Sequence, residues 1–227
     1  MRPKSFYDRE IQFTSQEEQK DFENEVYLET SLWKPSIGQV LGRGTFRTVR
    51  KAVLQHLETG QILPVIQKKV HHPMMKQYPL VEAFRWWKLQ KIRAPVLPFY
   101  KIDPEDLEMY GTDLRAGYGH SPGPSQVFDT NASSDHLERL QRLFAEKPLK
   151  NPQAVVEQVR GIILLLDQHG ISAHTDEVFL MVVQEREAVM QVLLGDLKMI
   201  DMAGVREDNA HSEKALLSFL SRFGVVA

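Results

Sequence analysis

The chain has 227 residues, of which 42% are hydrophobic and 26% are charged, and it contains no cysteine. This composition is that of a folded protein with room for one large domain or two small ones. The lack of cysteine excludes disulfide bonds, cysteine-ligated zinc, iron–sulfur clusters and thiol catalysis. With 28 Lys and Arg against 30 Asp and Glu, the net charge of −2 gives no general reason to expect nucleic acid or an anionic membrane as a partner.

The first 33 residues are polar and rich in Gln, Glu and Asp, and they predict a loosely docked arm with one short helix. The basic N-terminal residues are not followed by the apolar core of a secretory signal, and no stretch approaches the roughly 20 apolar residues that a membrane-spanning helix needs. We therefore expect a cytoplasmic protein without a membrane span. Delivery into a host cell stays open, because the signals of specialised secretion routes lack the ordinary pattern.

Strand patterns dominate the next part of the chain. Apolar and β-branched residues recur on both sides of the turn signal Glu58–Gln61, which predicts a hairpin. Apolar residues at spacings of three and four predict a helix over residues 79–92. Within it, we expect one ring of the pair Trp86 and Trp87 in the core and the other at a contact with the arm or a second lobe. Strands are expected within residues 36–41, 46–53, 62–70, 96–102 and 107–114.

Helical patterns dominate the second half, after a stretch dense in Gly, Pro and Ser that predicts a loop. Asn151-Pro152 is a typical helix start and precedes a wide apolar stripe, and Asp135 begins a capping-box spacing for a shorter helix before it. Strand-like runs at residues 178–183 and 190–200 predict a hairpin, and an amphipathic helix is closed by Gly224. A strand-rich half followed by a helix-rich half predicts an α+β fold in two lobes.

Three features of the strand-rich half suit phosphate binding. The run Gly42-Arg43-Gly44-Thr45-Phe46 lies between two predicted strands, and glycine lets the backbone approach a phosphate closely. Lys68 lies on the third strand, where its ammonium group would reach phosphate oxygens, and Glu82 on the following helix would pair with it. Each feature has a plainer alternative: a hairpin with a glycine turn, a solvated pair of Lys68 and Lys69 on an edge strand, and a surface glutamate.

Two segments of the helix-rich half carry candidate catalytic groups. HGISAHTD directly follows the predicted buried helix, and a later strand ends at Asp201. Taken separately, His174 is equally a core histidine, and Asp176 and Asp201 are equally turn residues. The order of the features favours chemistry, because a glycine-rich loop, a strand lysine, a helix glutamate, an H-x-D and a strand-terminal aspartate each fall on the element that phosphoryl transfer needs.

In this order, the motifs resemble those of the eukaryotic-like protein kinase family. GRGTFRTV resembles the glycine-rich loop, VIQKKV the lysine strand, HGISAHTD the catalytic segment, and LKMIDMAG the strand that leads to the metal-binding aspartate. The resemblance covers residues 36–205 in separate patches. It implies a bilobal kinase-like fold with a polar arm at 1–33, a β-rich N-lobe and hinge at 34–114, a Gly/Pro/Ser loop at 115–134 and a reduced α-helical C-lobe at 135–227.

The resemblance also implies roles for individual residues. Lys68 would bind the α- and β-phosphates of ATP, Met109 would be the gatekeeper beside adenine, and Asp176 would orient or deprotonate the substrate hydroxyl. The implied catalytic residues are Asp176, Lys68, Glu82 and His174; the implied nucleotide-binding residues are Gly42, Gly44, Val49, Lys68, Met109, Tyr110 and Thr112, the stretch from Tyr110 to Thr112 supplying hinge backbone; the implied metal ligands are Asp201 and Glu177.

The sequence also departs from the family pattern. Arg47 replaces the third glycine of the loop, and Met181 stands where the family has a metal-binding Asn. Either the catalytic loop is shortened, so that strand residues begin at Val178 and Glu177 substitutes as a ligand, or the second metal ligand is absent. The chain ends 23 residues after Gly204, which leaves no room for the family's usual peptide-substrate platform.

These features together lead us to expect an atypical minimal protein kinase, similar in build to bacterial kinase-like effectors. It would use ATP with Mg²⁺, or Mn²⁺ in its place, to phosphorylate Ser or Thr rather than Tyr on a protein substrate. Two alternatives stay open: a pseudokinase that serves as a binding module, and a kinase that acts on small molecules. The sequence leaves the oligomeric state open.

Overall fold

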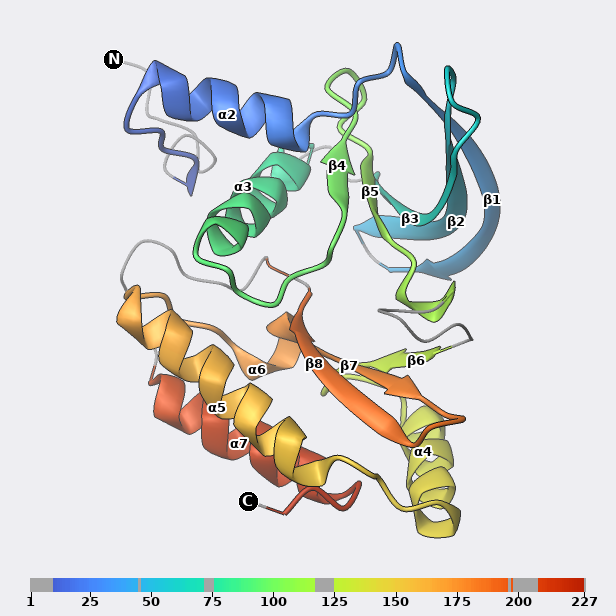
Figure 1. Ribbon diagram of the computed structural model, residues 1–227, viewed down its shortest axis with the longest axis vertical. Coiled ribbons are helices and arrows are strands. Elements are labelled where there is room, and N and C mark those ends of the chain that lie inside the picture. The colour runs from blue at the N-terminus through green and yellow to red at the C-terminus, as the bar shows by residue number, and fades with distance from the viewer. Residues whose placement is uncertain are drawn as a thin grey trace. The chain divides into compact units, whose positions relative to one another are not determined.

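The computed structural model describes residues 10–44, 46–71, 76–116, 125–195, 197 and 208–226, without the side chains of Asp176 and Glu177. The fold is α+β, as expected, and the chain divides into two compact units (Figure 1). Unit 1 comprises Met1–Ile92 and Leu97–Asp113, and unit 2 comprises Arg93–Val96 and Leu114–Ala227.

Unit 1 is built on an antiparallel sheet that, within the described residues, has five strands in the spatial order β1-β2-β3-β5-β4. The expected hairpin turn is confirmed between β2 and β3, where Gly60 adopts a φ of 71° that suits glycine. Irregular register in β1 accompanies the strong curvature of the first three strands in Figure 1. The strands are β1 (Trp33–Arg43), β2 (Arg47–His56), β3 (Ile62–Val70), β4 (Tyr100–Ile102) and β5 (Met109–Thr112).

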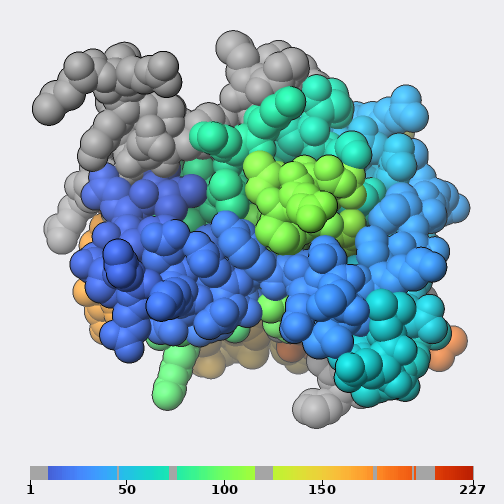
Figure 2. Space-filling view, turned by 90° about the horizontal axis from the view of Figure 1, so that it is seen from above, coloured from blue at the N-terminus to red at the C-terminus, as the bar shows by residue number. Residues whose placement is uncertain are grey.

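Helix α2 (Gln16–Val26) corrects the expectation of a loosely docked arm. Its sequence places Phe22 and Val26 on one face, and both side chains are buried. The ring of Phe22 lies 5.7 Å from that of Trp87 on α3 (Tyr78–Lys91), measured between centroids. The segment is therefore part of unit 1, and Figure 2 shows its dark-blue surface continuous with that of the strands.

The two tryptophans of α3 divide as the sequence predicts. Trp86 stacks on Tyr100 of β4 and donates its indole N–H to the carbonyl of Leu97 at 2.8 Å. Trp87 contacts the N-terminal segment instead, through Phe22 and through a hydrogen bond to a carboxylate oxygen of Glu25. Helix α3 is thus held on one side by β4 and on the other by α2.

Ion pairs reinforce the contact between the N-terminal segment and α3. Arg85 lies 2.6 Å from a carboxylate oxygen of Glu10, and Lys91 lies 2.5 Å from one of Glu25. Lys88 pairs with Glu18, and its ammonium group also lies 5.3 Å from the ring centroid of Trp87. Acidic groups of the N-terminal segment therefore meet basic groups of α3 along its length.

Unit 2 has a small antiparallel sheet in the order β6-β7-β8 and, in the described part, four α-helices. β6 corrects the predicted 115–134 loop, since Phe128 pairs with Met181 across the sheet and is buried. The elements are η2 (Leu114–Ala116), β6 (Ser125–Phe128), α4 (Ser134–Glu146), α5 (Pro152–Gln168), α6 (Thr175–Val178), β7 (Phe179–Gln184), β8 (Val189–Leu194) and α7 (Asn209–Ser221).

The helix α5 begins where the sequence predicts, but Asn151 acts differently from a simple cap. Its side-chain amide donates to the carbonyl of Met190 at 2.8 Å and accepts from the N–H of the same residue at 3.0 Å. These two bonds tie the start of α5 to β8. The predicted apolar stripe of α5 is buried as expected, at Val155, Val156, Val159, Ile162, Ile163 and Leu166.

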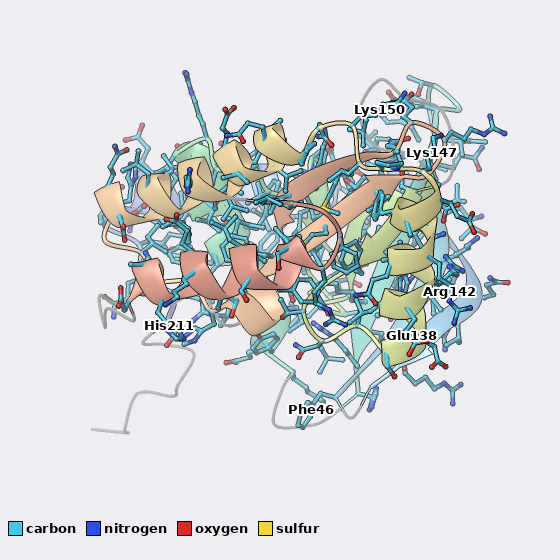
Figure 3. The ribbon with its side chains drawn as sticks, turned by 90° about the horizontal axis from the view of Figure 1, so that it is seen from below. Phe46, Glu138, Arg142, Lys147, Lys150 and His211 are labelled. Atoms are coloured by element: carbon cyan, nitrogen blue, oxygen red, sulfur yellow. The ribbon has the colours of Figure 1, made fainter. Side chains whose placement is uncertain are left out.

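Helix α4 begins two residues earlier than the capping box suggests, because Ser133 rather than Asp135 caps it by accepting from the N–H of His136. Glu138 and Arg142 form an exposed pair on its surface, and Lys147 beyond its end donates to backbone carbonyls of the β7–β8 turn (Figure 3). None of the helices in the described ranges combines the length and apolar character needed to cross a bilayer.

The contact of α2 with α3 predicts an acid-dependent loss of stability. The hydrogen bond from Lys88, and those from Thr14, lower the pKa of Glu18 from 4.5 to about 2. Because the pKa is lower in the folded state, Glu18 stabilises the fold above about pH 4.5, and this contribution is lost as the pH falls from about 4.5 to about 2. We expect Glu18→Gln to flatten the fall in the urea midpoint over this range, whereas Glu17→Gln, at an exposed neighbour, retains the wild-type slope.

Candidate functional site

Four residues predicted to surround a nucleotide lie in one row across the sheet of unit 1. Gly42 pairs with Val49, Val49 with Lys68, and Lys68 with Met109. Residues directly opposite one another on antiparallel strands project to the same face of the sheet. The side chains of Val49, Lys68 and Met109 therefore share one face, although 60 residues of chain separate the first from the last.

The ion pair of Lys68 with Glu82 is the centre of this face. The Lys68 Nζ lies 2.7 Å from the Glu82 Oε1, with the lysine side chain 13% exposed and the glutamate side chain 0% exposed. A buried carboxylate is tolerated only when a charge or hydrogen bonds compensate it. Of the two alternatives that the sequence left open for Glu82, the structure therefore has the ion pair and not the surface residue.

Arg47 adds a second positive charge that the sequence did not lead us to expect. Its Nη1 lies 3.8 Å from the other carboxylate oxygen of Glu82, Oε2, which accepts no hydrogen bond within the described residues. The residue that departs from the family's third glycine thus joins Lys68 and Glu82 in one cluster. Two cations, Lys68 and Arg47, thus approach the two oxygens of one buried carboxylate beside the predicted phosphate position.

The glycines of the predicted phosphate loop have open space beside them. A Cβ atom built on Gly42 would meet nothing within 4 Å, and one on Gly44 would come no closer than 3.8 Å to the Arg47 carbonyl oxygen. Neither glycine has a positive φ. By contrast, a Cβ on Gly195 would lie 2.0 Å from Leu180, so packing explains that glycine. Packing does not explain Gly42 and Gly44, and their open backbone fits the close approach of a phosphate.

Lys69 points away from this cluster, since adjacent residues of a strand face opposite sides of the sheet. It pairs with Glu108, and that hydrogen bond raises the pKa of Lys69. Glu108 also accepts from the hydroxyl of Tyr110 at 3.2 Å, and burial together with the Glu108 charge raises the pKa of Tyr110. The two lysines are therefore not an equivalent solvated pair.

The predicted adenine-binding backbone is engaged inside the sheet. Tyr110 and Gly111 lie in β5, which pairs with β3 on one side and β4 on the other, and the N–H of Thr112 donates to the Phe99 carbonyl at 3.1 Å. The first residue beyond the ladder is Asp113, which is also the last residue of unit 1. Met109 itself is buried, and its sulfur accepts from the hydroxyl of Tyr100 at 2.8 Å.

In unit 2, helix α7 holds the segment that carries the predicted catalytic groups. Asn209 is 5% exposed, and its amide donates to Asp167 Oδ1 at 2.6 Å and to the Ile171 carbonyl at 2.8 Å. Its Oδ1 accepts from the N–H of Ala173, and the hydroxyl of Ser212 donates to the carbonyl of Ala173 at 2.9 Å. The backbone immediately before His174 is thereby fixed.

His174 precedes α6 in the N-cap position and is half-buried. Asp176 and Glu177 follow within α6, and their side chains lie outside the description. Val178 ends α6 and Met181 lies in β7, and both are fully buried. Strand β7 thus begins directly after α6, at Phe179, one residue later than the strand start predicted at Val178.

The metal site predicted at Asp201 and Glu177 lies largely outside the described residues, which show only the chain around it. After β8, the N–H of Gly195 donates to the carbonyl of Val178 at 2.6 Å, so the chain leaves the hairpin beside the end of α6. Asp201 lies outside the described residues. Elsewhere in the described chain, no group of three His, Asp or Glu side chains is placed to hold a metal ion.

Arg47, Asn209 and Ser212 are the residues that sequence reasoning missed. In the sequence, Arg47 was noted only as the residue that replaces the third glycine of the loop. Asn209 and Ser212 lie in a segment that was predicted as a helix from its amphipathic pattern alone. No protein-family model matches the chain, and no match is found among the curated proteins.

The buried pair predicts a specific pattern of stability among variants. Lys68→Met leaves Glu82 with only the more distant Arg47, and it should lower the free energy of unfolding by about 3 kcal/mol or more. Replacing both charges, in Lys68→Met/Glu82→Met, should recover most of that loss, because the fully buried carboxylate is removed together with its closest cation. Urea unfolding measures both values. Equal destabilisation in the single and double variants would show that the pair does not govern this site.

The Asn209 contacts predict local opening of the segment before His174. Asn209→Ala leaves the buried N–H of Ala173 and the carbonyl of Ile171 without these partners, which should cost about 2–4 kcal/mol. Ser212→Ala removes one bond and should cost about 1 kcal/mol. Hydrogen exchange at the Ala173 amide checks the location of the effect: protection falls strongly in Asn209→Ala and little in Ser212→Ala. Unchanged protection in both variants contradicts the assignment.

Proposed function

We propose that the chain is a minimal protein-kinase-like phosphotransferase, with unit 1 as its N-lobe and unit 2 as a reduced C-lobe. It would bind ATP with Mg²⁺ and transfer the γ-phosphoryl group to a Ser or Thr hydroxyl of a protein. The observation that carries the proposal is the buried pair of Lys68 and Glu82, set in one sheet row with Gly42, Val49 and Met109. A surface lysine would not need a fully buried carboxylate to hold it.

In this proposal, the described residues would bind the phosphates and compensate their charge. Glu82 fixes the ammonium group of Lys68, so that the group loses little freedom when it binds phosphate oxygens. Arg47 is the second cation of the cluster, with its Nη1 3.8 Å from the Oε2 of Glu82. The open backbone at Gly42 and Gly44 would admit the phosphates. Because β5 is already hydrogen-bonded to β3 and β4, the adenine would bind backbone from Asp113 onward rather than at Tyr110–Thr112.

The remaining roles follow the family resemblance. Asp176 would accept the proton of the substrate hydroxyl as its oxygen bonds to the γ-phosphorus and ADP leaves, and Asp201 would hold the metal ion. ATP with Mg²⁺ supplies the transferable phosphoryl group and neutralises part of its charge. Asn209 and Ser212 act as positioning residues, because they fix the backbone that leads to Asp176. Such a site works where ATP is abundant, which suits a cytoplasmic location.

A nucleotide-binding pseudokinase is the second candidate. The family's second metal-ligand position favours it, because Met181 stands there in place of Asn and lies buried in β7. Stabilisation by nucleotide without turnover would support this candidate over the first. Consumption of ATP with sugars or aminoglycosides, without labelled protein, would instead support a small-molecule kinase.

Transfer of label from γ-labelled ATP tests the first candidate directly. We expect wild-type protein with Mg²⁺ or Mn²⁺ to label itself or a protein in a cell lysate. Lys68→Met/Glu82→Met and Asp201→Asn should each reduce the rate by about 100-fold or more. Lys34→Met, which removes an exposed lysine elsewhere on β1, should retain the wild-type rate. Absence of labelled protein with either metal, or full activity in the double variant, contradicts the proposal.

A further inference from the structure

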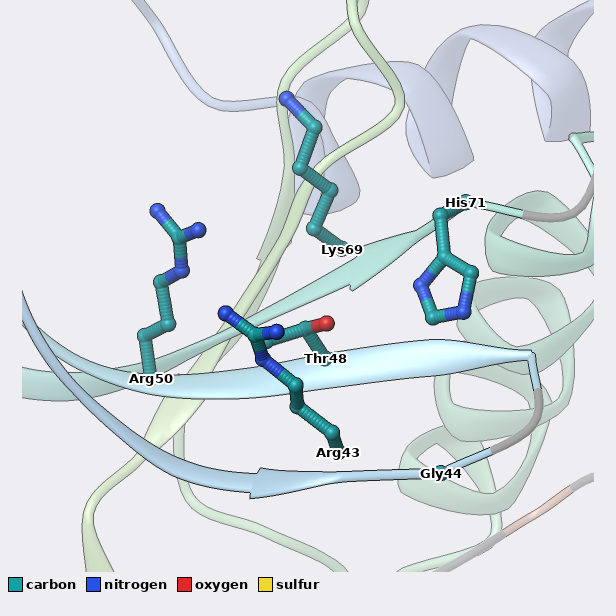
Figure 4. A pocket seen from close by; sticks show the side chains of 6 residues that line it. All are labelled: Arg43, Gly44, Thr48, Arg50, Lys69 and His71. Atoms are coloured by element: carbon teal, nitrogen blue, oxygen red, sulfur yellow. The ribbon is translucent and has the colours of Figure 1, made fainter.

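A second basic site lies on the sheet of unit 1, on the face opposite Lys68. It is an open pocket of about 330 Å³, which we call the outer-face pocket (Figure 4). Its side chains come from three neighbouring strands and from the residue after β3. The lining residues are Arg43, Gly44, Thr48, Arg50, Lys69 and His71.

Strand register separates the side chains of this pocket from those of the candidate nucleotide site, and only the backbone of Gly44 borders both. Arg43 pairs with Thr48, and Thr48 pairs with Lys69, so these three form the row next to that of Gly42 and Lys68. Neighbouring rows of a sheet project to opposite faces. Arg50 lies two residues beyond Thr48 on the same strand and therefore projects with it. Figure 4 shows Arg43, Arg50 and Lys69 rising on the same side of the strands.

Positive charge in the outer-face pocket is only partly compensated. Lys69 shares the carboxylate of Glu108. Within the described residues, the side chains of Arg43 and Arg50 form neither an ion pair nor a hydrogen bond, and the Nε of Arg50 is a buried donor without an acceptor. Three permanent cations thus face one carboxylate. A buried donor without a partner is costly and is satisfied by an incoming acceptor.

The lining chemistry selects a phosphoryl group. Arginine side chains bind phosphate oxygens through paired N–H donors, and the ammonium group of Lys69 and the hydroxyl of Thr48 add further donors. No aliphatic side chain, Phe, Tyr or Trp lines the pocket, so a nucleotide base would find no apolar surface there. The open mouth suits a phosphate carried on the side chain of another protein.

We propose that the outer-face pocket binds the phosphoryl group of a phosphoserine or phosphothreonine on a partner protein. Arg43 and Arg50 supply the two cations that no carboxylate of the described residues neutralises, and Lys69 and Thr48 complete the ring of donors. The site goes beyond the proposed phosphotransfer, because it needs neither Lys68 nor a metal ion. It would hold a phosphorylated protein whether or not the chain turns over ATP.

The test uses the full chain and two pentapeptides, Ala-Ala-phosphoserine-Ala-Ala and the same peptide with serine. We expect the phosphopeptide to shift the NMR amide signals of residues 43–50 and 69–71, and the serine peptide to leave them unchanged. Arg43→Gln/Arg50→Gln should weaken phosphopeptide binding at least tenfold. The charge-matched control Lys20→Gln/Lys34→Gln, at two exposed lysines outside the pocket, should bind within twofold of wild type. Inorganic phosphate should compete with the phosphopeptide.

Several outcomes overturn the proposal independently of the kinase proposal. Equal weakening in the pocket variant and the control would show non-specific attraction. Equal binding of the serine peptide, or failure of inorganic phosphate to compete, would exclude phosphoryl recognition. Binding to phosphatidylserine vesicles without binding to the phosphopeptide would assign the surface to membranes. The phosphopeptide shifts should persist in Lys68→Met/Glu82→Met, and their disappearance there would place the phosphate at the nucleotide site instead.

Discussion

The fully buried carboxylate of Glu82 is the constraint on which unit 1 depends. A carboxylate without solvent needs a compensating cation or hydrogen bonds. Lys68 on β3 supplies the cation, with its Nζ 2.7 Å from the Oε1 of Glu82. That contact exists only if α3 presents Glu82 towards the sheet and β3 presents Lys68 towards α3. The register of β2, β3 and β5 then fixes Val49 and Met109 on either side of Lys68. One charge pair thus links the helix, the sheet and the candidate site.

The N-terminal segment in unit 1 and α7 in unit 2 each hold in place an element that bears predicted site residues. In unit 1, α2 holds α3 through Phe22 and through acidic groups that pair with its lysines and arginine. Since Glu82 is on α3, this contact also stabilises the position of the carboxylate. In unit 2, Asn209 and Ser212 of α7 hold the backbone before His174. In each unit, a segment outside the predicted motifs fixes the element that bears them.

Local sequence signals predicted the elements and the pair but not the contacts between distant segments. Glu82 follows Lys68 by fourteen positions, and the two lie on a strand and on the next helix, so their pairing followed from short-range patterns. β6 was missed because its four residues are a strand only through pairing with β7. Arg47 and Asn209 were missed because polar side chains carry no periodic signal that tells a buried partner from a solvated one. The same limitation made a polar segment around Phe22 look loosely attached.

The central claim is that Lys68, held by Glu82, binds the phosphates of a nucleotide. Equilibrium unfolding with and without Mg²⁺ and ATP tests this claim most directly, because it requires binding but not turnover. At an ATP concentration 100 times the Kd, the free energy of unfolding of the wild type should rise by about 2.7 kcal/mol. Lys68→Met/Glu82→Met, which retains a neutral core at this position, should gain almost nothing. An equal gain in the two proteins, or no gain in the wild type at millimolar ATP, would contradict the account.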